Sequence, residues 1–205
     1  YDIVYDLDGG TNSSLNPVKY TIGSKVVLAS PTKTGYTFLG WTYDGQKTPE
    51  IGTTIRVGMV GNKRFTAKWK ANDYAVTFDA NGGTVSPESL AVTFDARFTL
   101  PVPVRKGYTF TGWFNGSTRY DDGTWTKTSD LSLTAEWELT KYSITYDLNG
   151  GSNHSSNPSR YTFLDSFTLK DPSRTGYTFL GWTYEGQTAP NKSVAVPVGT
   201  MGELS

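Results

Sequence analysis

The sequence predicts a mainly β protein built from three tandem domains of about 70 residues each, with little or no helix. Two observations carry this prediction. The chain is rich in Gly (22 residues) and aromatic residues (14%) and has two Met, a composition typical of short strands joined by tight turns. In addition, three sequence landmarks recur in the same order at a fixed spacing. No stretch carries the i, i+3, i+4, i+7 pattern of an amphipathic helix.

The three landmarks define the repeats. The first is an alternating strand ending in Asx-Gly-Gly, found at Tyr1–Gly10, Tyr74–Gly83 and Tyr142–Gly151. The second is the pattern Gly-Tyr-Thr-Phe-x-Gly-Trp, found at Gly35–Trp41, Gly107–Trp113 and Gly176–Trp182. The third is a closing strand with Ala-x-Trp, found at Phe65–Trp69 and Leu133–Trp137. These positions predict repeats at 1–70, 73–138 and 142–205.

Repeat three is expected to lack its final strand. Aligning Gly58 with Gly199 brings the chain to Ser205 just before a third Ala-x-Trp strand would begin. A sheet without its closing strand exposes an edge that can fray or pair with another chain. We therefore expect repeat three to be the least ordered, or to have its gap filled by a neighbour.

Within each repeat, the elements follow from local patterns. The opening strand alternates apolar and polar side chains, so that Tyr1, Ile3 and Tyr5 share one face. Asx-Gly-Gly then predicts a tight turn, because Gly tolerates positive φ and Asp or Asn bonds nearby backbone. Second strands are expected at 20–22, 92–94 and 161–163, and third strands at 26–28, 98–100 and 167–169. The Gly-Tyr-Thr-Phe-x-Gly-Trp segment is the fourth strand, and the Ala-x-Trp segment closes the repeat.

The recurring aromatic residues are expected to form the cores. A domain of about 70 residues without disulfide or metal needs large side chains to bury enough apolar area. The glycine before each central tryptophan (Gly40, Gly112, Gly181) is expected where a side chain would block a close contact. The residues predicted to define the cores are Tyr36, Phe38, Trp41, Trp69, Tyr108, Phe110, Trp113, Trp137, Tyr177, Phe179 and Trp182.

Charge and composition argue against several classes of protein. Lys+Arg and Asp+Glu both number 19, so no long-range field favours nucleic acid or an acidic membrane surface. The absence of Cys excludes disulfides, zinc thiolates and cysteine nucleophiles. No apolar run reaches the ~18 residues needed to span a bilayer, so direct membrane insertion is not expected.

No residue pattern predicts catalysis, a cofactor or a metal. The single histidine, His154, lies in a polar loop without a partner nucleophile. The Asp-x-Asx-Gly-Gly turns resemble the start of a calcium loop, yet position 12 offers Pro17, Leu90 and Pro158 instead of an acid. Acidic residues occur at unmatched positions in the repeats, unlike the paired carboxylates of a glycosidase. We expect no enzyme activity.

Trp125 is the one candidate ligand contact. It has no equivalent in the other repeats, so it is either an exposed contact for a sugar or protein or a local packing plug. The other aromatic residues recur on the periodic face, which favours a core role over a binding platform.

The order of landmarks resembles the Listeria–Bacteroides repeat, the family that contains the B repeat of internalin B. The resemblance covers the whole chain as three tandem copies. It departs at Phe65, where Leu is usual, and at the end of repeat three. It implies small β-grasp-like (ubiquitin-like) domains on the outside of bacteria, at the cell surface or wall, within larger proteins, and it implies no catalytic residues.

Two functional hypotheses follow. The first is a spacer or stalk region that projects other domains from a bacterial surface and makes host or matrix contacts. The second is an adhesin module that binds glycan or protein through exposed aromatics or a free sheet edge. Neighbouring domains of the same surface protein are the expected partners in the first case, and a host or matrix protein or a glycan in the second.

Overall fold

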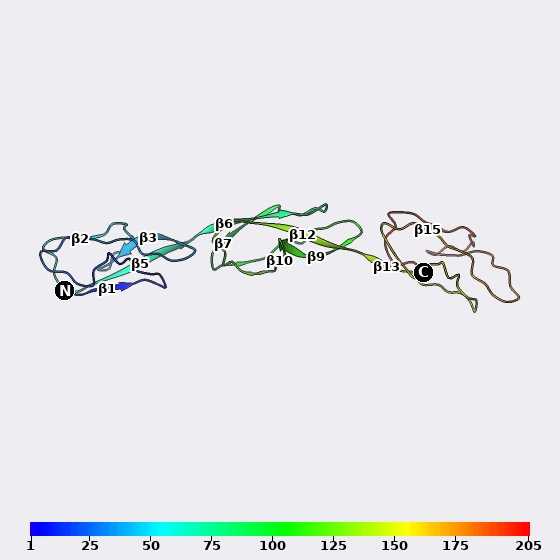
Figure 1. Cartoon of the computed structure of the whole chain (residues 1–205), viewed down its shortest axis with the longest axis horizontal. Helices are drawn as coiled ribbons and strands as arrows, with labels where there is room; N and C mark the ends of the chain where they lie inside the picture. Colours follow the sequence, from blue (N-terminus) through cyan, green and yellow to red (C-terminus); the bar gives the residue numbers. More distant parts are fainter. The chain divides into compact units, whose positions relative to one another are not determined.

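The computed structural model describes residues 1–205 and contains strands and turns but no helix, which confirms the mainly β prediction (Figure 1). None of its elements is a helix able to cross a membrane. The chain forms two compact units. Unit 1 comprises Tyr1–Phe78, Pro87–Pro101 and Tyr120–Leu133, and unit 2 comprises Asp79–Ser86, Val102–Arg119 and Thr134–Ser205. Repeat one lies in unit 1, repeat three lies in unit 2, and repeat two contributes to both units. The division of the chain into three separate domains, one for each repeat, therefore stays a prediction.

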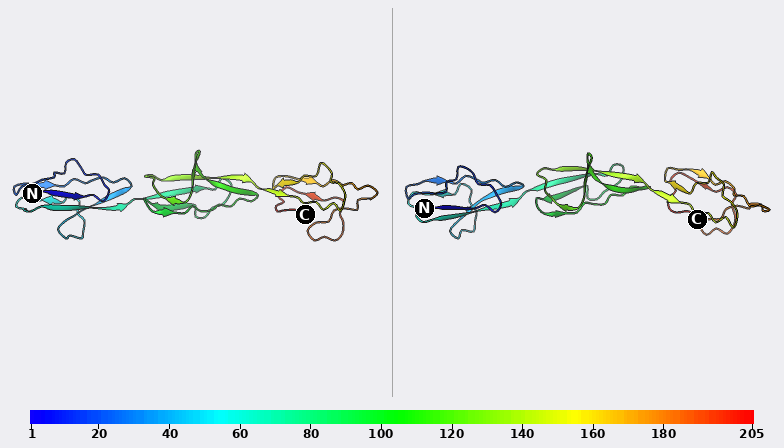
Figure 2. Two further views of the ribbon diagram at one scale, coloured as in Figure 1. Left: turned by 90° about the horizontal axis from the view of Figure 1, so that it is seen from below. Right: turned by 60° about the horizontal axis from the view of Figure 1, so that its bottom comes forward.

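Repeat one is organised around its last strand. Its strands are β1 (Ile3–Asp6), β2 (Val26–Val27), β3 (Tyr36–Thr42), β4 (Thr54–Ile55) and β5 (Lys63–Ala71). The sheet order is β1-β5-β3, with β5 parallel to β1 and antiparallel to β3. The blue β1 and cyan β5 arrows point the same way in Figure 2. β5 is therefore the central strand, and it joins the first and fourth strands of the repeat.

Repeat two has strands at the corresponding places, and its opening strand and fourth strand are longer than those of repeat one. They are β6 (Asp73–Asp79), β7 (Ser89–Thr93), β8 (Arg97–Phe98), β9 (Tyr108–Asn115), β10 (Thr118–Tyr120), β11 (Gly123–Thr124) and β12 (Leu131–Leu139). β6 pairs with β7, β8 with β11, and β9 with β12, each antiparallel. The predicted fourth and closing strands are thus paired as neighbours here too.

Repeat three contains four short strands. They are β13 (Lys141–Ser143), β14 (Arg160–Thr162), β15 (Phe167–Thr168) and β16 (Ala195–Val196), paired as β13 with β14 and β15 with β16. The predicted fourth strand does not form, and residues 145–148 and 177–181 are in no strand or bridge. The corresponding segments of repeat one are β1 and β3, and both pair with β5. Repeat three has no strand at the place of β5, so its two segments have no partner for a ladder. After β16 the chain makes one parallel bridge, from Ile144 to Leu204.

The prediction of a second strand in repeat one is also wrong. Residues 20–22 form no strand, although Asp2 and Lys19 make an isolated antiparallel bridge, and Tyr20 N donates to Tyr1 O. The corresponding segments of repeats two and three are strands, β7 and β14. Both of these make ladders with the opening segment of their repeat.

The Asx-Gly-Gly turns have the predicted conformation. Asp8 and Gly9 have φ of 47° and 79°, and the Gly10 N–H donates to Leu7 O over 2.9 Å. Both central residues therefore have positive φ, as in the type I′ turn that suits the twist of a hairpin. The same arrangement recurs at Asn81-Gly82 and Asn149-Gly150.

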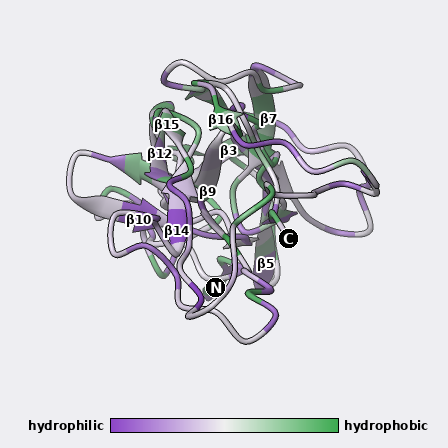
Figure 3. Cartoon of the chain, turned by 90° about the vertical axis from the view of Figure 1, so that its right-hand side faces the viewer, coloured by the Kyte–Doolittle hydropathy of each residue, from purple (hydrophilic) through white to green (hydrophobic).

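Each repeat buries its alternating face. In repeat one, the buried cluster consists of Ile3, Tyr20, Leu28, Trp41, Ile55, Phe65 and Ala67. Two of these residues, Phe65 and Ala67, come from β5, which shows how strongly this strand contributes to the core. In repeat three, the buried cluster is Ile144, Tyr161 and Val196, and β16 is coloured as hydrophobic in Figure 3.

Candidate functional site

A tryptophan forms the centre of every repeat. Trp41, Trp113 and Trp182 are all buried, and each packs edge-to-face on the phenylalanine three residues earlier. The ring centroids of Phe38 and Trp41 are 5.4 Å apart. The indole N–H groups of Trp41 and Trp182 have no hydrogen-bond partner, so these rings contribute through packing.

Gly40 and Gly181 allow the chain to approach closely beside this tryptophan. They have φ of 135° and 146°, and a Cβ on either would lie within 2.7 Å of the backbone of Glu50 or Asn191. At Gly112, a Cβ would meet side chains instead, with Phe114 Cε2 at 3.2 Å. The expectation of a close contact at this position is therefore confirmed, and in repeats one and three the contact is with backbone.

A second tryptophan closes repeats one and two by packing on the Asx-Gly-Gly turn that follows the opening strand. Trp69 Nε1 donates to Leu7 O, and Trp137 Nε1 donates to Ala80 O, both over 3.0 Å. The ring edge lies against the second glycine of the turn, because a Cβ on Gly10 would be 2.6 Å from Trp69 Cζ2. At Gly83 the same distance to Trp137 Cζ2 is 2.7 Å. We call this carbonyl and glycine the indole seat.

The indole seat was missed by sequence reasoning, although a signal for it exists. The first glycine of each pair has positive φ and is needed by the turn, but Gly10, Gly83 and Gly151 do not have positive φ. A glycine that recurs in all three repeats without a conformational reason indicates close approach by another group. In this chain the approaching group is the indole ring.

The tyrosine of the second landmark lies at the edge of its repeat, where its surroundings vary. Tyr36 packs on Phe94, and its hydroxyl donates to Asp95 Oδ2 over 2.8 Å, a bond that raises the Tyr36 pKa. Tyr36 and Tyr108 are half-buried. Tyr177 is 66% exposed, so its predicted core role is wrong. The Arg174 guanidinium lies over its ring, 3.9 Å from the centroid.

Trp125 is buried, at 2% exposure, which corrects its candidacy as an exposed ligand contact. It packs edge-to-face on Phe98 with centroids 5.6 Å apart. Its backbone N–H donates to Ala96 O over 3.0 Å, and its backbone carbonyl accepts from Asp95 N over 2.9 Å. The backbone bonds hold Trp125 beside the β8 and β11 pair, so the ring points into the core. This position fits the alternative interpretation, in which Trp125 fills space in the local core.

The remaining chemical candidates lie apart from one another. The exposed His154 accepts a hydrogen bond from Ser156 N at Nδ1 and shapes its own loop. No group of three or more His, Asp or Glu side chains in residues 1–205 is placed to hold a metal ion. Asp79 and Asp147 accept hydrogen bonds from Asn81 N and Asn149 N, which stabilise the turns.

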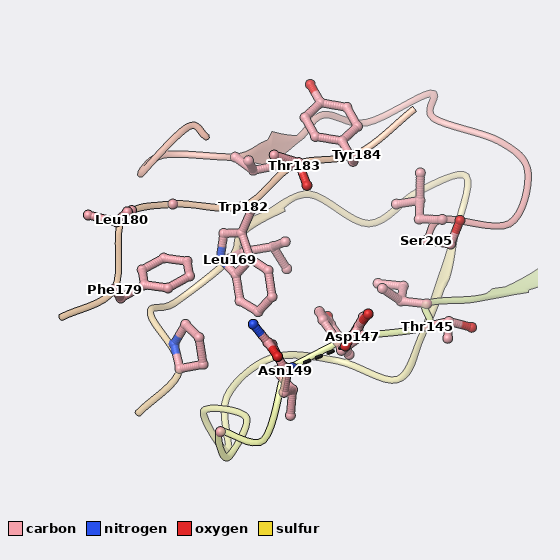
Figure 4. Close-up of a pocket in the computed structure, with 18 of the residues that line it drawn as sticks. Thr145, Asp147, Asn149, Leu169, Phe179, Leu180, Trp182, Thr183, Tyr184 and Ser205 are labelled. Carbon is pink, nitrogen blue, oxygen red and sulfur yellow. Dashed lines mark hydrogen bonds between the residues drawn. The ribbon is translucent and has the colours of Figure 1, made fainter. Parts of the chain in front are cut away.

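Repeat three contains a groove of about 1520 Å³. It is lined by residues 144–151 of the opening segment and 177–185 of the fourth segment, together with residues 172–175 and 194–197. Leu169, Phe179 and Trp182 line one side in Figure 4, and Asp147 and Asn149 lie opposite them. The opening and fourth segments are the counterparts of β1 and β3, the two strands that flank β5 in repeat one. We call this feature the repeat-three groove.

These features define a tandem array of small all-β repeats, each centred on a tryptophan. A family model for the Listeria-Bacteroides repeat domain matches residues 1–68, 74–136 and 142–198. The chain belongs to this family, as its landmarks indicate. No solved structure matches the chain.

Relatives of the chain include larger proteins. A putative membrane protein of Evansella cellulosilytica is 30% identical over 190 residues, covering 89% of this chain and 27% of the relative. A putative Gly-rich membrane protein of the same organism is 31% identical over 194 residues, covering 89% and 22%. Internalin H of Listeria monocytogenes is 34% identical over 133 residues, covering 60% and 22%. The chain thus spans about a quarter of the length of these relatives.

Proposed function

We propose that this chain is a structural repeat region of a bacterial cell-surface protein and acts as a spacer or stalk between other domains. The observation that carries the proposal is that nearly everything that recurs in the three repeats serves the core, the turn or the indole seat. Relatives named as membrane proteins and an internalin support a location at the cell surface or wall. No catalytic role is part of the proposal.

The short linkers between repeats support the spacer role. Asn72 N donates to Gly35 O over 2.9 Å, and Thr37 Oγ1 donates to Asn72 Oδ1 over 2.6 Å. In the second linker, Thr140 N donates to Gly107 O over 3.0 Å. A linker whose backbone is bonded to the preceding repeat has less freedom than a Gly/Ser tether of equal length. Such linkers suit a region that holds other domains away from a surface.

The same junctions carry aromatic contacts. Phe94 packs on Tyr36, and a Cβ on Gly35 would lie 2.3 Å from the Phe94 ring. Phe163 lies against Gly107 in the same way, with the Lys106 ammonium 5.4 Å from its ring centroid. In both cases the aromatic residue follows a second strand and meets the Gly-Tyr landmark of the preceding repeat. This repeated contact supports a spacer with stiffened junctions.

The test is to display a binding domain on a bacterial surface through this chain. Capture of the displayed domain by ligand-coated beads should exceed capture through a Gly/Ser linker of 205 residues, since a flexible chain is more compact than a stiff one. A matched variant with Phe94→Ala and Phe163→Ala should lower capture toward the Gly/Ser value. Equal capture by all three would contradict the spacer role.

The adhesin hypothesis is separated by a binding screen. The intact chain would be applied to glycan arrays and to host and matrix proteins. Specific, saturable binding would show that the chain is more than a spacer. Trp125→Ala is not a suitable probe of such binding, because Trp125 is buried and its loss perturbs the core.

A further inference from the structure

We propose that the first and last strands of repeats one and two form a shear clamp, which keeps each of these repeats folded while the chain is under tension. The shear clamp is the β1–β5 pair in repeat one and the β6–β12 pair in repeat two. A stalk that joins a surface to a bound target carries tension along its length. The inference therefore rests on the proposed stalk role and deepens it, by naming what resists that tension.

In repeat one, the strand that begins the repeat lies beside the strand that ends it. β1 and β5 pair in parallel, from Ile3 with Lys63 to Asp6 with Thr66. One further bond precedes this ladder, because Lys63 N donates to Asp2 O over 2.9 Å. Since the strands are parallel, the start of β1 and the end of β5 lie at opposite ends of the pair.

Repeat two, which has a repeat on either side, contains the same pair. β6 and β12 are neighbours in its sheet. Ala75 N donates to Asp130 Oδ1 over 2.8 Å, and the hydroxyls of Thr77 and Ser132 share a hydrogen bond of the same length. These contacts advance by two residues on both strands, which shows that β6 and β12 run in the same direction.

Tension on the chain acts along these strands. The chain enters repeat two at the start of β6 and leaves it at the end of β12, so a pull on the chain draws the two strands past each other. Hydrogen bonds of a ladder run across the strands, so this sliding strains all of them at once. A hairpin pulled at its two open ends instead loses one bond at a time. While the clamp holds, the force bypasses the segment between β6 and β12.

A side chain reinforces the start of the pair in each repeat. The backbone N–H of the residue after the opening tyrosine donates to a side-chain oxygen that precedes or begins the last pairing segment. These bonds join Asp2 N to Asn62 Oδ1 (2.9 Å), Ala75 N to Asp130 Oδ1 (2.8 Å) and Ser143 N to Glu203 Oε2 (2.9 Å). Three different residue types make the same bond, so the bond recurs although the residue does not.

The indole seat fastens the other end of the clamp. Trp69 of β5 donates to Leu7 O just after β1, and Trp137 of β12 donates to Ala80 O just after β6. The ring also lies against the second glycine of the turn. The last strand cannot slide along the first until the indole leaves this carbonyl and glycine. The two strands are thus joined beyond both ends of the ladder.

The experiment pulls on repeat two within the whole chain from two different directions. The chain has no Cys, so two introduced cysteines are its only attachment points for force spectroscopy. Lys70→Cys with Lys141→Cys loads the clamp in shear, because these exposed residues precede β6 and follow β12. Lys70→Cys with Ser129→Cys is the matched control. It pulls on the starts of both strands and peels them apart.

We expect the unfolding force to be severalfold higher for the shear pair than for the peeling pair at the same pulling speed. Forced unfolding follows the unfolding rate, so the forces should differ even though urea unfolding of the two variants is alike. The released contour length identifies repeat two as the part that unfolds. Equal forces in the two directions would overturn the proposal. Equal forces together with high capture in the display test would refute the clamp and leave the spacer role standing.

A second pair of variants tests the indole seat, with both proteins pulled in shear. Trp137→Phe keeps an aromatic ring but loses the bond to Ala80 O, so its unfolding force should fall. Trp125→Phe is the control, because Trp125 lies outside β6 and β12 and its indole N–H has no partner. The Trp125→Phe variant should lose equilibrium stability but keep most of the unfolding force. An equal fall in force in both variants would show that the seat adds nothing to the clamp.

Discussion

The Tyr36 ring packs edge-to-face on the Phe94 ring, with centroids 5.7 Å apart and an interplanar angle of 74°. The first residue belongs to repeat one and the second to repeat two, so this pair is a direct contact between the two repeats. Such a pair contributes about 0.5–1.5 kcal/mol beyond the area that it buries. The Tyr36 hydroxyl adds a hydrogen bond to Asp95 at the same junction.

A double-mutant cycle should measure this coupling. Tyr36→Ala and Phe94→Ala should each destabilise the chain, and the double variant should lose less than the sum by about 0.5–1.5 kcal/mol. The measurement is urea unfolding followed by fluorescence. Tyr177→Ala is the control, because this exposed ring packs on no other aromatic ring and its removal should cost no more than its cation–π contact with Arg174, about 0.5–1 kcal/mol. Additive losses at 36 and 94 would show that the repeats are not coupled.

The central tryptophan should be the most sensitive position of repeat one. Trp41 has no exposed surface and packs on Tyr5, Phe38 and Phe65. Trp41→Ala removes these contacts and should cost about 3–5 kcal/mol, enough to unfold a small domain. Circular dichroism melting would follow the loss. A cost below about 1 kcal/mol would contradict the central role of this residue.

Trp125→Ala should act on stability rather than on recognition. Because Trp125 packs in the core against Phe98, its truncation should cost about 3–5 kcal/mol. The contribution of Trp125 to the fluorescence of the wild-type chain is obtained by subtracting the spectrum of the Trp125→Phe variant. Added oligosaccharides should leave this contribution unchanged. A Trp125→Ala variant as stable as wild type would contradict the buried position of Trp125.

Stability should fall in alkali because of half-buried tyrosines. Burial raises the pKa of Tyr5 to about 12, while the unfolded value is about 10. The folded state therefore favours the neutral phenol. The contribution is fully present below about pH 10 and is lost as the pH rises toward 12. Burial also raises the pKa of Tyr146.

The test of this pH dependence is urea unfolding between about pH 8 and pH 12. Tyr5→Phe lacks the ionisable group and should show a shallower decline than wild type above about pH 10. Tyr177→Phe, at an exposed ring, serves as the control and should follow the wild-type profile. An unchanged slope in Tyr5→Phe would assign the alkaline loss to other groups.

Repeat three should show the least protection in hydrogen exchange. Residues 145–148 and 177–181 form no ladder, whereas their repeat-one counterparts pair with β5. Amides without ladder bonds exchange through small local openings. Mass spectrometry of exchanged fragments should give the lowest protection in 142–205. Equal protection in all three repeats would contradict this prediction.

Much of the fold could be predicted because the residues that recur are also the residues that pack. The alternation of Tyr1, Ile3 and Tyr5, the Asx-Gly turn and the buried Trp41 all follow from local sequence rules. The environment of Tyr177 could not be predicted in this way. Its sequence matches that of Tyr36, but its exposure depends on a neighbouring aromatic that the local pattern does not contain.

The site was harder to predict than the core for the same physical reason. The indole seat joins Leu7 and Gly10 to Trp69, and the turn alone explains neither the second glycine nor its partner. The groove depends on which strands flank β5, and that sheet order is a long-range property. Sequence patterns predict which face of a strand is buried but leave the neighbour of each strand open.

The position of β5 at the centre of its sheet has a consequence for how the protein is made. The first ladder pair of repeat one joins Ile3 to Lys63, so the sheet cannot assemble until nearly the whole repeat has left the ribosome. Contacts this distant in sequence form slowly, because a long loop must close first. Repeat one should thus stay unfolded during synthesis until its last tryptophan, Trp69, has emerged.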